Sequence, residues 1–418
     1  MDEASIVASS SARLAPAGVP PLSRRAAGLT EFALAIGGFA IGTGEFAIMG
    51  LLPDVAEGLG VSTPEAGHVI SAYALGVVVG APVIALAAAK MAKRQLLLIL
   101  MAIFALGNLA STFAPSYGSF VVFRFLSGLP HGAYFGVAAL VAASMAAPNK
   151  RTQAVGRVML GLTVATLIGT PFATWLGQLA GWRSLFATVG AIAALTVLLV
   201  AIFVPQDRVR DGAGAMRELG AFARSQVWFT LGIGAVGFGG MFAVFSYIAS
   251  TAVAVAGLSE SSVPLIMVAF GAGMVLGNIA GAWLADRSLM GTIGGMLVFN
   301  VVVLTVFALF ASSPVVLFLC VFLIGCGVAV GPALQTRLMD VAGDAQTLAA
   351  ALNHSAFNVA NALGAWLGGA AIAAGYGFAS TGWVGAVLGL GGLGIFALSA
   401  SAERARPAAA LREADACA

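Results

Sequence analysis

Twelve long apolar runs divide this 418-residue sequence, and they limit its fold more than any other feature. A helix needs about 20 apolar residues to cross a bilayer, and each run is roughly that long. A membrane β-barrel would instead show alternating segments of about ten residues, which this sequence lacks. We predict an all-α membrane protein with twelve transmembrane helices, near residues 31–52, 66–89, 95–113, 119–147, 154–180, 184–204, 226–249, 262–285, 289–311, 313–336, 347–374 and 378–400.

The composition excludes several classes of protein. Apolar residues make up 60% of the chain and charged residues 9%, with a mean hydropathy of +1.01. Soluble domains carry about 25% charged residues, so we exclude a soluble enzyme, a disordered protein and a nucleic-acid binder. The net charge of +3 is also too small for a surface that binds a polyanion. Three cysteines without a nearby histidine indicate neither a disulfide framework nor a metal site, and nothing indicates a cofactor.

Basic residues indicate how the chain is oriented in the membrane. Cytoplasmic loops of membrane proteins are enriched in lysine and arginine. With both termini placed in the cytoplasm, 18 of the 20 basic residues lie in inner segments. Of the remaining two, Arg183 lies in an outer loop and Arg124 lies within a span. We therefore predict that both termini are cytoplasmic.

The two halves of the chain repeat each other at an offset of 197 residues. At this offset Gly42 matches Gly239, and Lys90 matches Arg287. Parallel repeats of six spans are known from transporters, which bind their solute between the halves near the midplane of the membrane. The predicted organisation is a disordered cytoplasmic N-terminus (1–28), an N-terminal six-helix bundle (29–204), a cytoplasmic linker (205–225), a C-terminal six-helix bundle (226–400) and a cytoplasmic tail (401–418).

Three stretches of the sequence resemble one family of membrane transporters. They are GTGEFAIMGLLPDVAEGLGVS in span 1, AGHVISAYALGVVVGAPVIAL in span 2 and RFLSGLPHGAYFGV in span 4. These stretches are similar to the drug:proton antiporter branch of the major facilitator superfamily, and in particular to AraJ-type exporters. The resemblance implies two pseudo-symmetric six-helix bundles in a bacterial inner membrane. It also implies a monomeric secondary transporter, not an enzyme, that exports a sugar or drug-like solute in exchange for protons by alternating access.

The resemblance also points to residues that control gating. In the superfamily, the loop between spans 2 and 3 carries an acid, two glycines and several basic residues. Here the basic residues Lys90, Lys93 and Arg94 are kept, but the acid and both glycines are replaced by alanine. The second-half copy of this motif keeps its acid in the pair Asp286 and Arg287. The sequence therefore does not support an inner gate held by a carboxylate of the first half.

Small residues and a proline are predicted to shape two other spans. Gly128 and Gly132 lie four residues apart in span 4, a spacing that lets two helices approach closely. In span 5, Thr170 separates Gly169 from Pro171. In the antiporters that the chain resembles, this glycine and proline are adjacent. Antiport is therefore favoured over symport, although the motif is a weaker form.

Glu45 is the only acid deep within a predicted span, and Arg124 is the only base there. An ionisable residue in hydrocarbon costs at least about 2.5–3.5 kcal/mol, so it normally faces the bundle interior and has a function. At about 1.5 Å of rise per residue, the two side chains lie at similar depths below the outer surface. We hypothesise that Glu45 carries a proton and that Arg124 senses its charge. The alternative is a permanent buried ion pair that only fixes the bundle.

Aromatic and amide side chains within the spans are candidates for binding the solute. In the second half, Phe242 occupies the position of Glu45 and Val321 that of Arg124, so charge is confined to the first half. A cavity with one titratable wall, from the first half, and one aromatic and amide wall, from the second half, suits an uncharged or weakly polar solute. The alternatives are lipid exposure for the phenylalanines and interhelical hydrogen bonds for the histidines and amides. The predicted substrate-binding residues are His131, Tyr134, Phe238, Phe242, Phe245, Tyr247, Asn278, His354, Asn358 and Asn361.

The residues present argue against two other classes of membrane protein. A membrane enzyme would need paired acids, an activated nucleophile or metal ligands, and the sequence offers no such cluster. An ATP-driven pump would need a Gly-x-x-x-x-Gly-Lys-Ser/Thr motif, which is absent. A sensor of the same fold without transport activity stays open, as does efflux of purines or nucleosides. The expected partners are a small solute, protons and the lipid bilayer, and no nucleic acid.

Overall fold

The computed structural model describes residues 23–88, 91–146, 151–206, 222–342 and 346–416. Within these ranges the regular structure is helical, without strands. Twelve helical segments are long and apolar enough to cross a membrane, and each overlaps one of the twelve predicted runs. The prediction of an all-α, twelve-span membrane protein is therefore confirmed.

The first half of the chain forms spans 1 to 6. Span 1 is followed by the short helix α3, and span 5 is interrupted by the π-helical turn η3. Because Pro171 lacks a backbone N–H, it cannot complete regular helical hydrogen bonding just after this turn. The elements are α2 (Arg24–Gly50), α3 (Leu52–Leu59), α4 (Thr63–Ala87), α5 (Lys93–Thr112), α6 (Tyr117–Met145), α7 (Arg151–Val164), η3 (Ala165–Gly169), α8 (Thr170–Ala180) and α9 (Arg183–Phe203).

The second half forms spans 7 to 12. Span 7 contains the π-helical turn η5, and a break at Ser246 and Tyr247 separates α12 from α13. The elements are α11 (Ser225–Gly232), η5 (Ile233–Gly237), α12 (Gly239–Phe245), α13 (Ile248–Ala254), η6 (Glu260–Ser262), α14 (Val263–Arg287), α15 (Leu289–Phe310), α16 (Pro314–Cys326), η7 (Gly327–Ala329), α17 (Val330–Ala342), α18 (Gln346–Ala371), η8 (Ile372–Tyr376) and α19 (Ser380–Ala416).

Helices cross closely in each half at glycines that match at the 197-residue offset. A Cβ on Gly76 of α4 would overlap the carbonyl oxygen of Phe125 on α6. At the matching crossing, a Cβ on Gly273 of α14 would overlap the carbonyl oxygen of Phe322 on α16. Without a strong hydrophobic drive between helices in lipid, close backbone approach supplies the packing energy. The repeat in the sequence is thus a repeat of helix crossings.

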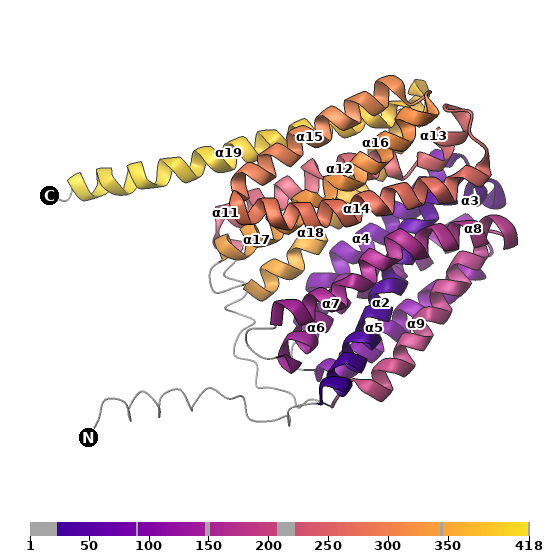
Figure 1. Cartoon of the computed structure of the whole chain (residues 1–418), viewed down its shortest axis with the longest axis horizontal. Coiled ribbons are helices and arrows are strands. Elements are labelled where there is room, and N and C mark those ends of the chain that lie inside the picture. Colours follow the sequence, from indigo (N-terminus) through magenta and orange to yellow (C-terminus); the bar gives the residue numbers. More distant parts are fainter. Residues whose placement is uncertain (1–22, 89–90, 147–150, 207–221, 343–345, 417–418) are drawn as a thin grey trace.

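Figure 1 shows the helices of the two halves as two bundles side by side, with α2 beginning and α19 ending at the same end of the molecule. We call this the termini end, and the opposite end the far end. Near the far end, Gln178 of α8 donates a 2.9 Å hydrogen bond to the carbonyl oxygen of Glu260 in η6. Deeper in the molecule, the Ser71 hydroxyl of α4 donates to the carbonyl oxygen of Ala362 on α18 at 3.2 Å. These contacts hold the two halves together from the far end inward.

Two predicted segment boundaries differ from the structure. Helix α2 begins at Arg24, inside the segment 1–28 that was predicted to be disordered. The side chain of Ser23 caps this helix by accepting a hydrogen bond from the backbone N–H of Ala26, which explains the earlier start. At the other terminus, α19 continues through the predicted tail to Ala416. Alanine has the highest helix propensity, and this stretch is rich in it. Residues 1–22 and most of the predicted linker lie outside the described residues.

Candidate functional site

Glu45 lies on the face of α2 that meets the second half. Its side chain is buried, and its Oε1 accepts a hydrogen bond from Nδ2 of Asn361 on α18 at 3.3 Å. The next residue, Phe46, stacks on Phe242 of α12 with ring centroids 6.4 Å apart. Because α2 brings its carboxylate and an aromatic ring to the other half together, the predicted proton carrier lies at the interface between the bundles.

Arg124 of α6 is buried beside Glu45 but does not bond to it. Its Nη2 donates to the carbonyl oxygen of Gly44 at 3.3 Å, and its guanidinium lies 4.3 Å from the ring centroid of Tyr73 on α4. Its Nε and Nη1 have no hydrogen-bond partner among the described residues. Within the described chain the ion pairs lie elsewhere, so this conformation does not contain the permanent buried ion pair that was the alternative hypothesis.

Tyr73 is a residue of this site that the sequence analysis missed. Its hydroxyl lies 2.9 Å from Nδ1 of His131 on α6, and its ring lies beneath the guanidinium of Arg124. It therefore connects the predicted histidine to the predicted arginine within one buried group. A signal for it existed, because a tyrosine buried in an apolar span needs a partner for its hydroxyl.

The predicted phenylalanine stripe faces the protein interior. Phe238, Phe242 and Phe245 are all buried, so their exposure to lipid is excluded. Phe245 stacks on Phe270 of α14 with centroids 3.6 Å apart. Together with Phe46, the residue after Glu45, these rings form an apolar wall where the two halves meet.

The predicted polar face of α18 also points toward the first half. The ring of His354 stacks on Phe135 of α6, with centroids 5.5 Å apart and an interplanar angle of 8°. Asn358 donates from Nδ2 to the carbonyl oxygen of His354 at 3.0 Å, and Asn361 reaches Glu45. The Oδ1 atoms of both asparagines are buried and have no partner among the described residues. This face therefore offers free hydrogen-bond acceptors next to the carboxylate.

Three of the predicted substrate-binding residues have other environments. The hydroxyl of Tyr134 donates to the carbonyl oxygen of Leu34 at 2.7 Å, and that of Tyr247 donates to the carbonyl oxygen of Ala365 at 2.7 Å. Both tyrosines are completely buried, so their hydroxyl groups bond neighbouring helices and are not free for a solute. Asn278 is exposed on α14 rather than buried at the interface. These three residues are therefore not part of the candidate solute site.

The described residues of the predicted gating motif lie outside this buried group. Lys90 falls outside the described residues. Lys93 begins α5, and the Arg94 side chain donates to the carbonyl oxygen of Ala201 on α9. In the second-half copy, Asp286 is exposed and the Arg287 guanidinium lies 3.5 Å from the ring centroid of Trp283.

The predicted packing residues lie at helix crossings. A Cβ on Gly128 would overlap the carbonyl oxygen of Tyr73, and one on Gly132 would lie 2.8 Å from the Cβ of Ala81. Gly169 faces Thr43 and Phe39 of α2 at the end of η3, and the buried Pro171 follows. Gly128 and Gly132 thus bring α6 close to α4, and Gly169 brings η3 close to α2.

A second ionic group in the first half was also missed. Glu31 of α2 accepts two hydrogen bonds from Arg157 of α7, at 2.6 and 2.8 Å. Glu31 lies at the edge of a predicted span and Arg157 in a predicted inner segment, so the sequence does not mark either of them as an ionisable group deep in the membrane. The pair lies toward the termini end and joins two helices of the same bundle.

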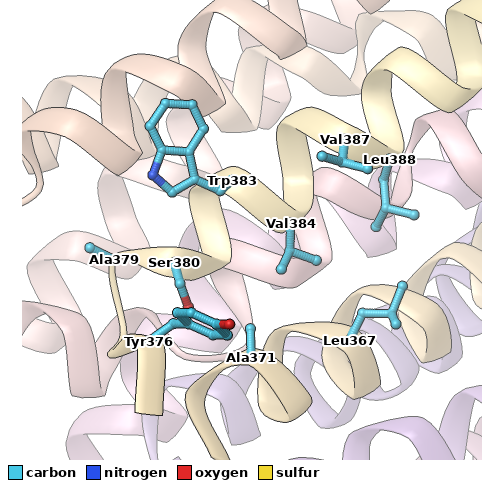
Figure 2. Close-up of a pocket in the computed structure, with 9 residues that line it drawn as sticks. All are labelled: Leu367, Ala371, Tyr376, Ala379, Ser380, Trp383, Val384, Val387 and Leu388. Carbon is cyan, nitrogen blue, oxygen red and sulfur yellow. The ribbon is translucent and has the colours of Figure 1, made fainter. Parts of the chain in front are cut away.

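A groove of about 650 Å³ lies away from the site, where α18 and η8 meet α19. Figure 2 shows Tyr376, Ser380 and Trp383 beside the leucine and valine side chains that line it. None of the predicted proton-coupling or substrate-binding residues lines this groove. The candidate site is therefore the buried group around Glu45.

The chain is similar to known membrane transporters over most of its length. Residues 34–345 match the Major Facilitator Superfamily. The inner membrane transport protein YdhP of Escherichia coli is 40% identical over 85% of this chain and 92% of its own length. The putative transporter AraJ of Escherichia coli is 38% identical over 80% of this chain and 86% of its own length. The chloramphenicol resistance protein of Streptomyces lividans is 31% identical over 80% of this chain and 87% of its own length.

Solved structures share the fold at low sequence identity. A bacterial homologue of the human lysosomal transporter Spinster, in an inward-facing and occupied conformation, superposes with a TM-score of 0.70 and 16% identity. The match covers 91% of this chain and 98% of that one. The D-xylose-proton symporter superposes with a TM-score of 0.68 and 18% identity, over 88% of this chain and 96% of that one.

Proposed function

Because this chain belongs to the major facilitator superfamily, a family of membrane transporters, we propose that it exports a small organic solute in exchange for protons. We propose that the protein lies in a bacterial inner membrane, because the relative YdhP is named an inner membrane transport protein. Both termini are placed in the cytoplasm because 18 of 20 basic residues then lie on that side. Proton entry supplies the energy, about 2.3 kcal/mol per charge for each 100 mV of membrane potential.

The observation that carries this proposal is the place of Glu45. A carboxyl group at this depth is costly when ionised, so a proton can bind to it and leave again within the membrane. Its hydrogen bond to Asn361 joins the two bundles. Adding a proton to the carboxylate changes this contact, and alternating access requires such contacts between the halves to change. Arg124 donates a hydrogen bond to the carbonyl oxygen of Gly44, the residue before Glu45, and at this position it senses the charge of the carboxylate.

The solute is proposed to be a sugar or a drug-like molecule without net charge. The Phe238 and Phe242 rings provide an apolar wall, whereas His131, Asn358 and Asn361 provide polar groups. Export of sugars is suggested by the probable sugar efflux transporter of Helicobacter pylori, which is 28% identical over 86% of this chain. Export of drugs is suggested by the chloramphenicol resistance protein, which is similar over a comparable length.

The test is transport by the full-length protein in proteoliposomes with an acidic lumen. Labelled chloramphenicol and labelled L-arabinose are added outside, and their accumulation is followed as protons leave the lumen. Wild-type protein should accumulate at least one of them, and Glu45→Gln should abolish the dependence on the pH gradient. Glu57→Gln is the matched control, because Glu57 is an exposed acid of α3 in the same half.

Three results would separate the alternatives. Solute binding without flux would indicate a sensor. Flux that does not respond to the pH gradient would exclude proton exchange. Accumulation of labelled purine nucleosides, but of neither chloramphenicol nor arabinose, would move the proposal to purine efflux.

A further inference from the structure

We propose that Asn361 transmits the protonation state of Glu45 to the solute by turning its side-chain amide. The solute would then be a neutral molecule with several hydroxyl or N–H donors. This inference rests on the proposed function, in which Glu45 carries the coupling proton. It adds a device by which proton and solute exclude each other without competing for the same atom.

Asn361 is a buried amide that, within the described residues, is hydrogen-bonded at one end of its side chain and free at the other. The side chain has no exposed surface, and its Nδ2 donates to Oε1 of Glu45 at 3.3 Å. Its Oδ1 has no hydrogen-bond partner among the described residues. A buried polar atom without a partner is destabilising, so native structures rarely keep one without a reason. The missing partner of Oδ1 is assigned here to the solute.

An amide suits this role because its two ends have opposite hydrogen-bonding character. An ionised carboxylate only accepts hydrogen bonds, so it must face the Nδ2 end and leave Oδ1 free. A protonated carboxyl group also donates, and its O–H can be accepted by Oδ1 after the amide turns about its last side-chain bond. This torsion is broad and roughly two-fold in asparagine. The free end of the amide is therefore an acceptor when Glu45 is charged and a donor when Glu45 is neutral.

The other titratable groups around Glu45 make no hydrogen bond to it among the described residues, although Nε and Nη1 of Arg124 also lack a partner there. Arg124 on α6 donates to the Gly44 carbonyl, and the Tyr73 hydroxyl on α4 bonds to His131. From α12 of the second half, the ring of Phe242, which cannot titrate, stacks on Phe46, the residue after Glu45. The amide on α18 is thus the described side chain that hydrogen-bonds to the carboxylate.

Two further free groups on α18 indicate the class of solute. The Oδ1 of Asn358 and the Oγ of Ser355 are buried and have no partner among the described residues. With Asn361 they follow one another at intervals of three residues, which is about 4.5 Å of rise per step along the helix. Two of the three free atoms are amide oxygens, which accept hydrogen bonds. A molecule with several hydroxyl or N–H groups matches this row, whereas a cation without donors does not.

The decisive measurement is the acid-minus-alkaline infrared difference spectrum of the full-length protein in liposomes, without solute. Wild-type protein should show a carboxylic C=O band that Glu45→Gln removes. In Asn361→Leu this band should move to higher frequency, because the protonated carboxyl group loses its hydrogen bond to the amide. Asn361→Ser, whose side chain is too short to reach Glu45, should produce the same shift and replaces the leucine variant if that does not fold. Ser71→Ala, which removes a neighbouring contact between the halves, should leave the band in place.

A band that keeps its frequency in the folded Asn361 variants overturns the inference. A band that moves as expected, in a protein that accumulates no solute against a pH gradient, supports the Asn361 contact and rejects the proposed function.

The class of solute is tested by binding of three probes. Chloramphenicol and L-arabinose carry hydrogen-bond donors, and tetraphenylphosphonium is a cation without donors. Binding of a donor-bearing probe at alkaline pH should weaken about tenfold in Asn361→Leu, which corresponds to one neutral hydrogen bond. Binding of tetraphenylphosphonium alone, or of none of the three probes, overturns the assigned solute class.

Discussion

The two halves of this protein share their backbone packing but not their chemistry. In both, the second and fourth helices of the bundle cross where glycines bring one backbone against the other. The matched crossings are formed by Gly76, Gly80 and Gly128 in the first half and by Gly273, Gly277 and Gly325 in the second. The repeat preserves what the helices need to pack in lipid, and this requirement is the same on both sides of the molecule.

The side chains that face the other half have diverged. At the 197-residue offset, Glu45 corresponds to Phe242 and Tyr73 corresponds to Phe270. The first half therefore has a carboxylate and a tyrosine hydroxyl where the second half has phenyl rings. The difference teaches that one bundle carries the carboxylate, the guanidinium and the tyrosine hydroxyl, whereas the other provides an apolar wall and the histidine and amides of α18. Their meeting point is the hydrogen bond between Glu45 and Asn361.

The largest expected effect tests the shared packing. Gly128→Leu and Gly325→Leu should each prevent folding or lower stability by about 1–3 kcal/mol or more, because a side chain there meets the backbone of another helix. Yield of monodisperse protein and melting temperature measure the effect. Gly136→Leu is the control, because nothing lies within 4 Å of a Cβ at Gly136. A severe loss in only one half would contradict the equivalence of the two crossings.

The next effect tests whether charge belongs to one half. Arg124→Lys keeps the charge but loses the planar group that lies over Tyr73 and donates to Gly44. Loss of a hydrogen bond from a charged group costs about 1.5–3 kcal/mol, so proton-driven flux should fall at least about tenfold. Val321→Ala at the matched position should keep flux within about threefold. Equal losses at the two positions would remove the proposed division of roles.

A smaller effect makes the first half more like the second. Tyr73→Phe copies the residue found at the matching position, Phe270, and removes the hydroxyl that bonds to His131. Because the ring over Arg124 is kept, we expect a loss of about 1 kcal/mol in stability and a few-fold loss in flux. Thermal unfolding and proteoliposome transport would measure the two losses. Unchanged flux would place the hydroxyl outside the transport cycle.

The smallest effect concerns the far end, outside the membrane spans. Partial burial raises the pKa of the Asp54 carboxyl above its usual value, and Glu260 of the second half and Glu57 raise it further. The folded state therefore favours the protonated form, and its stability should fall as the pH rises through this raised pKa. Asp54→Asn should slightly raise the melting temperature at neutral pH and make no difference at acid pH. Glu57→Gln removes one neighbouring charge but leaves Asp54 buried, so it should give a smaller effect, and an equal effect would show that burial is not the main cause.

The fold was predictable because each span is encoded locally. A single apolar run decides whether a helix crosses the membrane, and the 197-residue offset follows from comparing runs of one chain. That Phe242 and Asn361 each share a helix face with their neighbours was also predictable, since positions i, i+4 and i+7 lie on one side of a helix, but whether the phenylalanine face met lipid or protein was not.

The partners of these residues were not predictable in the same way. Whether the Asn361 amide meets Glu45 depends on how α18 and α2 are rotated and how far they are shifted along their axes, and neither run specifies this. Tyr134 illustrates the difficulty, because it lies one turn from His131 on α6 yet bonds to a backbone carbonyl of α2. Depth along the helices likewise pairs Glu45 with Arg124, whereas in the structure the arginine bonds to the neighbouring backbone.

The long final helix has a practical consequence for watching this protein at work. Its membrane-spanning part ends near Arg404, but α19 continues to Ala416 and projects from the bundle in Figure 1. Twelve more residues of helix extend about 18 Å, so a fluorophore attached at the end of the chain would be carried well clear of the lipid headgroups. Because it is joined to the second bundle by an unbroken helix, it would amplify any tilt of that bundle into a readable displacement.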